Sequence, residues 1–296
     1  MNREIALAVC YYQPEKKYIS NACCVPVQLG FSETQVDFGI ERDDTGDNRS
    51  NKHPLYSEYS GVYWVWKNIE ASYKGMLHHR RFLTTRKEPP ASAIPRHAKG
   101  MVKAFVNIFM HKPYHYNERV LCSSDREYER GVAEFCQVLP GILSDGNDII
   151  VPRPYCFHHM TVGELFDEVV TRQILSSVRL AIQEKCPSLG SYYERTWAGD
   201  RLYYGSLEIM RDDLFDRYCE TVFGVFDVVE KDLGRLFVDP CGEMYLYRTF
   251  GYIGELLTNS YVLMARDEGA RVKELTMLFN GSARGNEDID YKNFSI

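Results

Sequence analysis

Residues 5–17 read Ile5-Ala6-Leu7-Ala8-Val9-Cys10-Tyr11-Tyr12-Gln13-Pro14-Glu15-Lys16-Lys17. The apolar run from Ile5 to Cys10 has the length and composition of a buried β-strand. The segment from Tyr11 to Lys17 is polar and rich in turn-forming residues. In open α/β sheets, ligands bind beyond the carboxyl ends of the strands. This stretch therefore predicts an α/β fold with a ligand site close to its loop.

Strand-length apolar runs and segments with helical periodicity alternate along the rest of the chain, which favours an α/β fold. We expect one domain over residues 1–281, an insertion near residues 86–135 and a polar tail over residues 282–296. A capping box, Thr161-x-x-Glu164, opens one of the helices. The expected strands cover residues 25–30, 75–77, 148–152 and 202–209, and the expected helices cover 54–72, 99–110, 161–187, 213–233 and 250–264.

The composition excludes several classes of protein. The chain has 296 residues and a net charge of −6, which argues against a protein that binds nucleic acid backbones. No run approaches the roughly 18 apolar residues of a membrane span, and nothing near Met1 resembles a signal peptide. The 9 cysteines are scattered without a C-x-x-C pair, as is typical of reduced thiols. We expect a cytoplasmic protein.

The four residues His78-His79-Arg80-Arg81 follow the strand expected at 75–77. One interpretation is a solvated surface turn, because neighbouring cations repel and are costly to bury unpaired. The other is a clamp for a phosphate or diphosphate, because the arginine guanidinium matches phosphate oxygens bidentately. The residues alone leave both interpretations open.

The loop over residues 41–50 carries Asp43, Asp44 and Asp47 among turn-forming residues. Such carboxylates bind a cation, hold sugar hydroxyls or act as a general base, but they also cap their own turns. There is no Walker loop, G-x-G-x-x-G or G-x-S-x-G motif, so nucleotide triphosphate hydrolysis, dinucleotide binding and α/β-hydrolase chemistry lose support. The D-x-D sequence Asp288-Ile289-Asp290 lies in the polar tail without an apolar strand before it, which argues against a metal site there.

Taken together, several segments resemble a bacterial domain family that is found in capsular-polysaccharide and lipopolysaccharide gene clusters and includes galactofuranosyltransferases. The family pattern consists of a D-D-T-G-D-N loop, a Y-W-x-W-K-N helix and an H-Y-R-R strand end. Weaker similarity continues to residue 257. The matching segments are Asp43-Asp44-Thr45-Gly46-Asp47-Asn48, Tyr56-Ser57-Glu58, Tyr63-Trp64-Val65-Trp66-Lys67-Asn68 and Gly75-Met76-Leu77-His78-His79-Arg80-Arg81-Phe82.

The resemblance implies a GT-A-like, Rossmann-related sandwich with a mixed, mostly parallel sheet, and a transferase that uses a nucleotide diphosphate sugar, with UDP as the expected nucleotide. We hypothesise that arginines take the place of a metal ion, because they stabilise the charge of the departing diphosphate. No metal ligand is therefore assigned, and bound Mn or Mg is the alternative that we do not favour. The donor-binding candidates are Tyr11, Gln13, Asp43, Asp44, Thr45, Asn48, His78, His79, Arg80 and Arg81.

Glycosyl transfer also needs a carboxylate that takes the proton of the acceptor hydroxyl. The resemblance makes Glu255 and Asp47 the catalytic candidates, and Glu58, Tyr203 and Ser206 the candidates for acceptor or sugar contacts. Tyr203 and Ser206 replace a histidine and an asparagine of the family pattern, and His79 replaces a tyrosine.

These departures leave open a degenerate, noncatalytic module that binds a nucleotide or carbohydrate. A nucleotidyl- or phosphoryl-transferring enzyme is a further alternative, although it would need a buried carboxylate pair to hold magnesium. The expected acceptor is a saccharide, free or lipid-linked. No basic amphipathic helix is evident, so we expect at most peripheral contact with the inner face of the cytoplasmic membrane.

Overall fold

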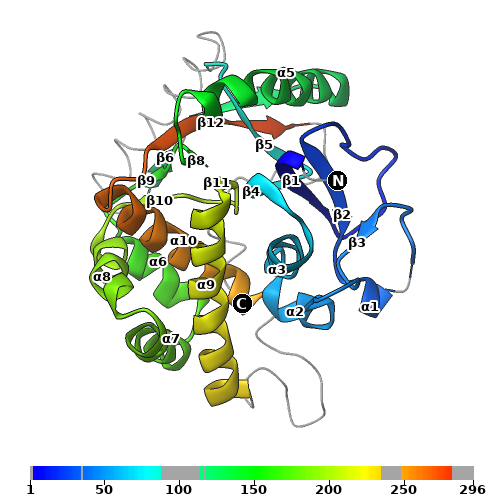
Figure 1. Cartoon of the computed structure of the whole chain (residues 1–296). Helices are drawn as coiled ribbons and strands as arrows, with labels where there is room; N and C mark the ends of the chain where they lie inside the picture. The colour runs from blue at the N-terminus through cyan, green and yellow to red at the C-terminus, as the bar shows by residue number, and fades with distance from the viewer. Residues whose placement is uncertain (1–2, 35, 88–113, 117, 235–247, 282–296) are drawn as a thin grey trace.

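The computed structural model describes residues 3–34, 36–87, 114–116, 118–234 and 248–281 (Figure 1). The helix expected at 99–110, the sequence Asp288-Ile289-Asp290 and the tail at 282–296 lie outside the described residues. Much of the insertion expected near 86–135 lies outside them as well. These expectations stay predictions.

A nine-stranded mixed sheet forms the centre of the described part of the chain, in the order β11-β8-β12-β5-β4-β1-β2-β3 with β7 on β12. Its strands are β1 (Arg3–Tyr11), β2 (Cys24–Gln28), β3 (Glu41–Arg42), β4 (Ala71–His78), β5 (Arg81–Thr84), β7 (Arg119–Cys122), β8 (Ile149–Pro152), β11 (Glu208–Arg211) and β12 (Val272–Asn280). A second, three-stranded sheet contains β6 (Tyr114–Tyr116), β9 (Tyr155–His158) and β10 (Arg201–Leu202).

Helices cover both faces of the large sheet. In Figure 1, α5 (Asp125–Ser144) lies above the sheet, where it packs on β5, β7 and β12, and α3 (Tyr59–Asn68) and α9 (Asp212–Leu233) lie below it against β4. Next to α9 lies α10 (Thr249–Asp267). The other helices are α1 (Phe31–Thr34), α2 (His53–Tyr56), α6 (Val162–Val169), α7 (Arg172–Lys185) and α8 (Gly190–Ala198), with short 3₁₀ turns at Ser50–Lys52 and Pro187–Leu189. None of the described helices combines the length and apolar character needed to cross a membrane.

The register of β1 with its neighbours brings several strand ends to one edge of the sheet. β1 pairs in parallel with β2 and β4, and β2 pairs in parallel with β3. Tyr11 stands opposite Gln28, which stands opposite Arg42, and Cys10 stands opposite His78. The loops that follow β1, β3 and β4 therefore start side by side at the carboxyl edge, where open α/β sheets bind ligands.

Most of the elements with strong local patterns are where the sequence predicts them. The strands expected at 5–10 and 148–152 are β1 and β8, and the helices expected at 213–233 and 250–264 are α9 and α10. The capping box is also confirmed, because Thr161 Oγ1 accepts from the Glu164 amide at 3.1 Å and the Glu164 carboxylate accepts from the Thr161 amide at 2.7 Å.

Three expected elements are instead interrupted. The helix expected at 54–72 is broken at Ser57, whose φ of 53° is left-handed, and its second half ends at Asn68 before β4 begins. The helix expected at 161–187 is split into α6 and α7 by the extended residue Val170. The strand expected at 202–209 is split into β10 and β11 by a turn in which Gly205 and Ser206 have φ angles of 95° and 49°.

The prediction of a mostly parallel sheet is not confirmed. β4, β5 and β12 follow one another in antiparallel pairs, and β11 is antiparallel to both β4 and β8. The large sheet is therefore mixed, with its parallel pairs between β1 and β2, β1 and β4, β2 and β3, β12 and β7, and β12 and β8. Gly75 of β4 permits the close approach of β11, because a Cβ at this position would lie 2.1 Å from the Glu208 carbonyl oxygen.

Candidate active site

Aromatic rings pack together where β1 and β4 end. The Tyr11 ring stacks on His79 with centroids 5.3 Å apart, and His79 stacks on His78 at 4.3 Å. His79 Nδ1 also lies 3.0 Å from the Cys10 carbonyl oxygen. Tyr11 itself is 2% exposed, and its hydroxyl accepts from the Ile19 amide. Tyr12 is 37% exposed, so Tyr12 rather than Tyr11 is accessible at this edge.

The His78-His79-Arg80-Arg81 segment is half-buried, so it is not the fully solvated turn of the first interpretation. The pKa of His79 is lowered to about 4, chiefly by burial and also by the nearby Arg80 and Arg81, whereas the hydrogen bond to the Cys10 carbonyl opposes this shift. The pKa of His78 is also lowered, by burial and then by Arg81. Both imidazoles are therefore neutral at pH 7, and the arginines carry the positive charge.

The two arginines have different surroundings. Arg80 donates to the Tyr12 hydroxyl at 3.1 Å, at the exposed rim. The Arg81 guanidinium lies 5.2 Å from the centre of the Tyr204 ring. Burial alone would lower the pKa of Arg81, but Tyr204, Tyr155 and the carboxylates Glu255 and Glu58 raise it. Arg81 is therefore a permanent cation in a partly desolvated position.

Glu58, Glu208 and Glu255 come from distant parts of the chain and form a glutamate group in which the charge of Glu58 acts on the other two. Glu208 and Glu255 are buried, and Glu58 is partly buried. Glu255 of α10 is 7% exposed, and its Oε1 accepts from the Gly205 amide at 3.1 Å. The pKa of Glu255 is raised to about 8, first by burial and then by Glu58, and this rise is opposed by the Gly205 amide, Arg81 and Arg248. Its proton affinity is thus close to the one expected of a general base that works near neutral pH.

Glu58, directly before α3, is the ionised member of this group. Burial acts to raise the pKa of Glu58, but Arg248 and the hydroxyls of Ser57 and Ser206 outweigh burial and lower it. Ser206 Oγ donates to Glu58 Oε1 at 3.1 Å, and Arg248 Nη2 lies 3.7 Å from Glu58 Oε2. The left-handed Ser57, which interrupts the expected helix, donates to the same carboxylate.

Glu208 of β11 was not among the candidates from the sequence. It is 1% exposed, and within the described residues its Oε1 has no hydrogen-bond partner. The pKa of Glu208 is raised to about 8 by burial and, to a smaller extent, by the charges of Glu58 and Glu255. The only signal in the sequence is an acidic residue within the apolar run Leu207-Glu208-Ile209-Met210.

Arg248 was also missed. It has a left-handed φ of 64° directly before α10, and its amide donates to the Pro54 carbonyl at 2.9 Å. No local pattern marks this residue, because its significance comes from Glu58, which lies 190 positions earlier in the chain and 3.7 Å away. Arg81 and Arg248 thus bring two guanidinium groups to the buried glutamates.

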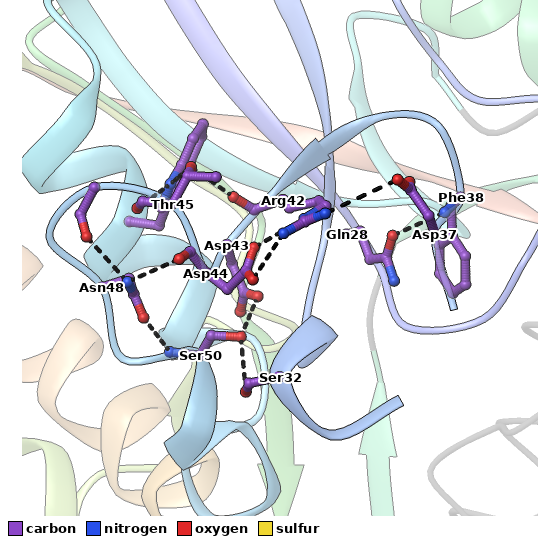
Figure 2. A network of polar contacts seen from close by, with 12 residues as sticks. Gln28, Ser32, Asp37, Phe38, Arg42, Asp43, Asp44, Thr45, Asn48 and Ser50 are labelled. Atoms are coloured by element: carbon purple, nitrogen blue, oxygen red, sulfur yellow. Dashed lines mark hydrogen bonds and ion pairs between the residues drawn. The ribbon is translucent and has the colours of Figure 1, made fainter. Parts of the chain in front are cut away.

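The acidic loop after β3 is held mainly by its own polar groups, as Figure 2 shows. Asp43 is fully buried and accepts from the Ser50 hydroxyl at 2.6 Å, the Ser60 hydroxyl at 2.9 Å and the Gly30 amide at 3.2 Å. Asp44 forms a two-point ion pair with Arg42, with both contacts at 2.9 Å. Asp43 and Asp44 therefore hold the loop in place.

The rest of the loop is tied to α3. Trp64 Nε1 donates to Thr45 Oγ1 at 2.9 Å, and the Tyr63 hydroxyl donates to Asp47 Oδ1 at 3.1 Å. Asn48 closes the loop through the carbonyls of Asp44 and Gly46, as the dashed lines in Figure 2 partly trace. The structure thus groups Glu255, and not Asp47, with Arg81 and Glu58.

Of the three candidates for acceptor or sugar contacts, Ser206 lies with Glu58, whereas Tyr203 lies elsewhere. Ser206 binds Glu58 in the buried glutamate group. The Tyr203 hydroxyl instead donates to Glu274 at 2.7 Å and accepts from Arg266 at 2.9 Å. Tyr203 lines a separate cavity of about 260 Å³ between α8, β10, α10 and β12. Gln13 is exposed in the loop after β1.

Among the described residues, no three His, Cys, Asp or Glu side chains form a group that would hold a metal ion.

Comparison with known proteins adds a family and a fold. The family model described as "Domain of unknown function (DUF4422)" matches residues 7–266. No curated protein matches the chain significantly. A solved structure described as the apo structure of the bifunctional glycosyltransferase WbbM is similar, with a TM-score of 0.71 and 22% identity. The similarity covers 94% of this chain but 46% of that chain, so this chain spans about half of the larger protein.

Proposed function

This chain belongs to the DUF4422 family of domains of unknown function, and we propose that it is a glycosyltransferase that moves a hexose from a nucleoside diphosphate sugar to a saccharide acceptor. The fold that it shares with a bifunctional glycosyltransferase supports the proposal. So do the motifs that resemble those of polysaccharide-synthesising transferases. The finer assignments below rest on the side chains around the glutamate group.

The observation that carries the proposal is that the glutamate with a raised pKa, Glu255, shares a site with the cation Arg81 at the carboxyl edge of the sheet. Sugar transfer from a diphosphate needs a base for the acceptor hydroxyl and a positive group for the leaving diphosphate. Both are present, and Glu58 adds a negative charge that acts on Glu255 and Arg81. A satisfied structural ion pair would not leave Glu255 with a pKa of about 8.

We assign the donor to the edge formed by the loops after β1, β3 and β4. Arg80 and Arg81 bind the diphosphate, with Arg248 beside Glu58 as a third cation. The exposed ring of Tyr12 stacks on the nucleotide base, which we take to be uracil. The backbone of the acidic loop positions the ribose of the donor, because the Asp43 and Asp44 carboxylates already bind Ser50 and Arg42.

The proposed reaction proceeds with inversion. The acceptor hydroxyl oxygen forms a bond to the anomeric carbon while the bond from that carbon to the diphosphate oxygen breaks. The hydroxyl proton passes to the Glu255 carboxylate, and the electron pair of the broken bond stays on the diphosphate, which Arg81 stabilises. Since Glu255 must be ionised to accept the proton, the rate should rise with pH up to about 8.

The acceptor side is a proposal from the resemblance alone. We assign the enzyme to surface polysaccharide synthesis at the inner face of the cytoplasmic membrane, with galactofuranose or another hexose as the sugar. The acceptor is a saccharide, free or carried on a lipid.

The test is a binding panel followed by a transfer assay. UDP, GDP, CMP and dTDP are each added in excess EDTA and, separately, with manganese, and the melting temperature is measured. A ligand at about 100 times its dissociation constant stabilises the fold by about 2.7 kcal/mol. A UDP shift that persists in EDTA supports the arginine clamp, and a shift that requires manganese contradicts the metal-free assignment.

Sugar transfer from the matching nucleotide sugar is then followed by mass spectrometry with a panel of saccharide acceptors. A product supports the enzyme. A nucleotide or glycan that binds without turnover or donor hydrolysis would favour the noncatalytic module.

A further inference from the structure

Three cysteine side chains meet beside β1, away from the glutamate group. Cys24 is the first residue of β2, Cys23 directly precedes it, and Cys136 lies on α5. The sulfur atoms of Cys24 and Cys136 are 3.6 Å apart, and Cys23 Sγ lies 3.9 Å from the Cys136 carbonyl oxygen. All three are free thiols in the structure. The fold thus brings the sulfur atoms of Cys24 and Cys136, which are 112 positions apart in the chain, into contact.

The two facing thiols have different environments. Cys24 is 1% exposed, whereas Cys136 is half-buried and open to small solutes. The Cys136 sulfur accepts a hydrogen bond from Asn21 Nδ2 at 3.5 Å and faces the thiol of Cys24. The Cys24 contact is the main cause of a lowered pKa at Cys136, and the pKa of Cys24 is raised. Thiolate character and exposure, which control oxidation, therefore coincide at Cys136.

We propose that Cys136 and Cys24 form an oxidation site, at which a peroxide oxidises Cys136 and Cys24 then closes a disulfide. In the first step the Cys136 thiolate attacks one peroxide oxygen, the O–O bond breaks, and Cys136 becomes a sulfenic acid with release of water or an alcohol. In the second step the Cys24 sulfur attacks the sulfenic sulfur, and water leaves as the S–S bond forms. The two thiols lose two electrons and the peroxide gains them.

Among the cysteines in the described ranges, Cys24 and Cys136 have the sulfur-to-sulfur contact that this reaction needs. A disulfide needs the two sulfurs to approach from 3.6 Å to about 2.05 Å. Cys23 and Cys24 contact different atoms of Cys136: Cys23 Sγ lies near its carbonyl oxygen, whereas Cys24 Sγ faces its sulfur. The other half-buried cysteines, Cys156 and Cys186, have oxygen atoms rather than sulfur as partners.

The proposed disulfide would link the sheet to α5. Cys24 stands opposite Leu7 of β1, and α5 also carries Tyr128, whose hydroxyl donates to the His78 carbonyl at 3.5 Å. Oxidation would therefore fix the helix that supports the His78-His79-Arg80-Arg81 turn to the strand beside β1. The chemistry at the cysteines does not depend on the function proposed above.

The test is peroxide treatment of the full chain, followed by alkylation of the remaining thiols and peptide mapping. We expect a linked peptide that contains Cys24 and Cys136, that forms at lower peroxide than any change at Cys186, and that dithiothreitol reverses. Peroxide that modifies Cys186 as readily as Cys136, or the absence of a linked peptide, would overturn the proposal. This measurement on the wild type needs no variant to fold.

Adjacent substitutions identify the partner thiol. Cys23→Ser should leave the link intact, whereas Cys24→Ser should abolish it and leave a sulfenic acid at Cys136 that dimedone traps. If Cys23→Ser abolishes the link and Cys24→Ser does not, Cys23 is the partner and the assignment of Cys24 is wrong. Cys136→Ser should remove both the link and the dimedone adduct.

Discussion

The acidic loop after β3 and the buried glutamate group contain similar side chains in opposite states. Asp43 in the loop is fully buried and accepts three hydrogen bonds, so its charge is matched. Glu208 in the glutamate group is equally buried, yet one of its oxygens has no partner within the described ranges, and its pKa is raised to about 8. Buried polar groups are normally satisfied, so an unsatisfied one needs an explanation. The difference indicates that the loop is structural and that the glutamate group is the place for chemistry.

The largest expected effect separates the two carboxylates that compete for the role of base. Glu255→Gln should lower kcat by a factor of about 10² to 10⁴, because the amide cannot take the acceptor proton. Asp47→Asn is the matched control and should change kcat only slightly, because Asp47 binds Tyr63 in the loop. The measurement is sugar transfer at saturating donor, with melting curves to verify folding. A normal rate for Glu255→Gln together with a loss in Asp47→Asn would reverse the comparison.

The structure also explains why the loop was predicted from the sequence and the glutamate group only in part. The Asp43–Asn48 motif and the pattern of β1 are local, so they can be recognised within a few residues. The site at Glu208 exists because β11 pairs with β4, which brings residue 208 beside residue 76. Arg248 depends in the same way on its approach to Glu58. Contacts between such distant residues leave no periodic signal in the sequence. The strand β12 was not predicted either, because the charged residues near its start interrupt its apolar pattern.

The second prediction tests the cation that faces the glutamates. Arg81→Ala should lower kcat by about 10² to 10³, the cost of losing one group that stabilises transition-state charge. Arg81→Lys should recover part of the rate, because it keeps the charge but loses the planar fork. Arg42→Ala removes an arginine that is already paired with Asp44, so it is the control and should retain most of the activity. Equal losses in the Arg81 and Arg42 variants would show that the effect is structural.

The third prediction concerns the stability of the loop. Asp43→Ala should lower the free energy of unfolding by about 3 kcal/mol, because the hydroxyls of Ser50 and Ser60 lose a charged partner in a buried site. Asp44→Ala removes an ion pair in which the Arg42 side chain is 32% exposed, and should cost less than about 1 kcal/mol. Urea unfolding of both variants at pH 7 measures the difference. Similar values for the two would mean that the Asp43 site is not as fully satisfied as its contacts indicate.

The smallest effect is the pH dependence that Glu208 should confer on stability. Its folded-state pKa of about 8 lies above the usual value of 4.5 that it regains on unfolding, so between these limits the folded chain keeps a proton that the unfolded chain releases. Stability should therefore fall as pH rises within this window, by about 1.4 kcal/mol per pH unit for this one group.

Glu208→Gln should remove this slope, because the amide does not titrate. The variant should consequently gain stability relative to the wild type by about 1.4 kcal/mol between pH 6 and pH 7. Every other titrating group is common to both chains, so the difference between their urea unfolding curves isolates the contribution of Glu208. Parallel stability curves for the two proteins would mean that Glu208 is ionised in the fold and has a partner that satisfies it, as Asp43 has. The contrast between the loop and the glutamate group would then rest on Glu255 alone.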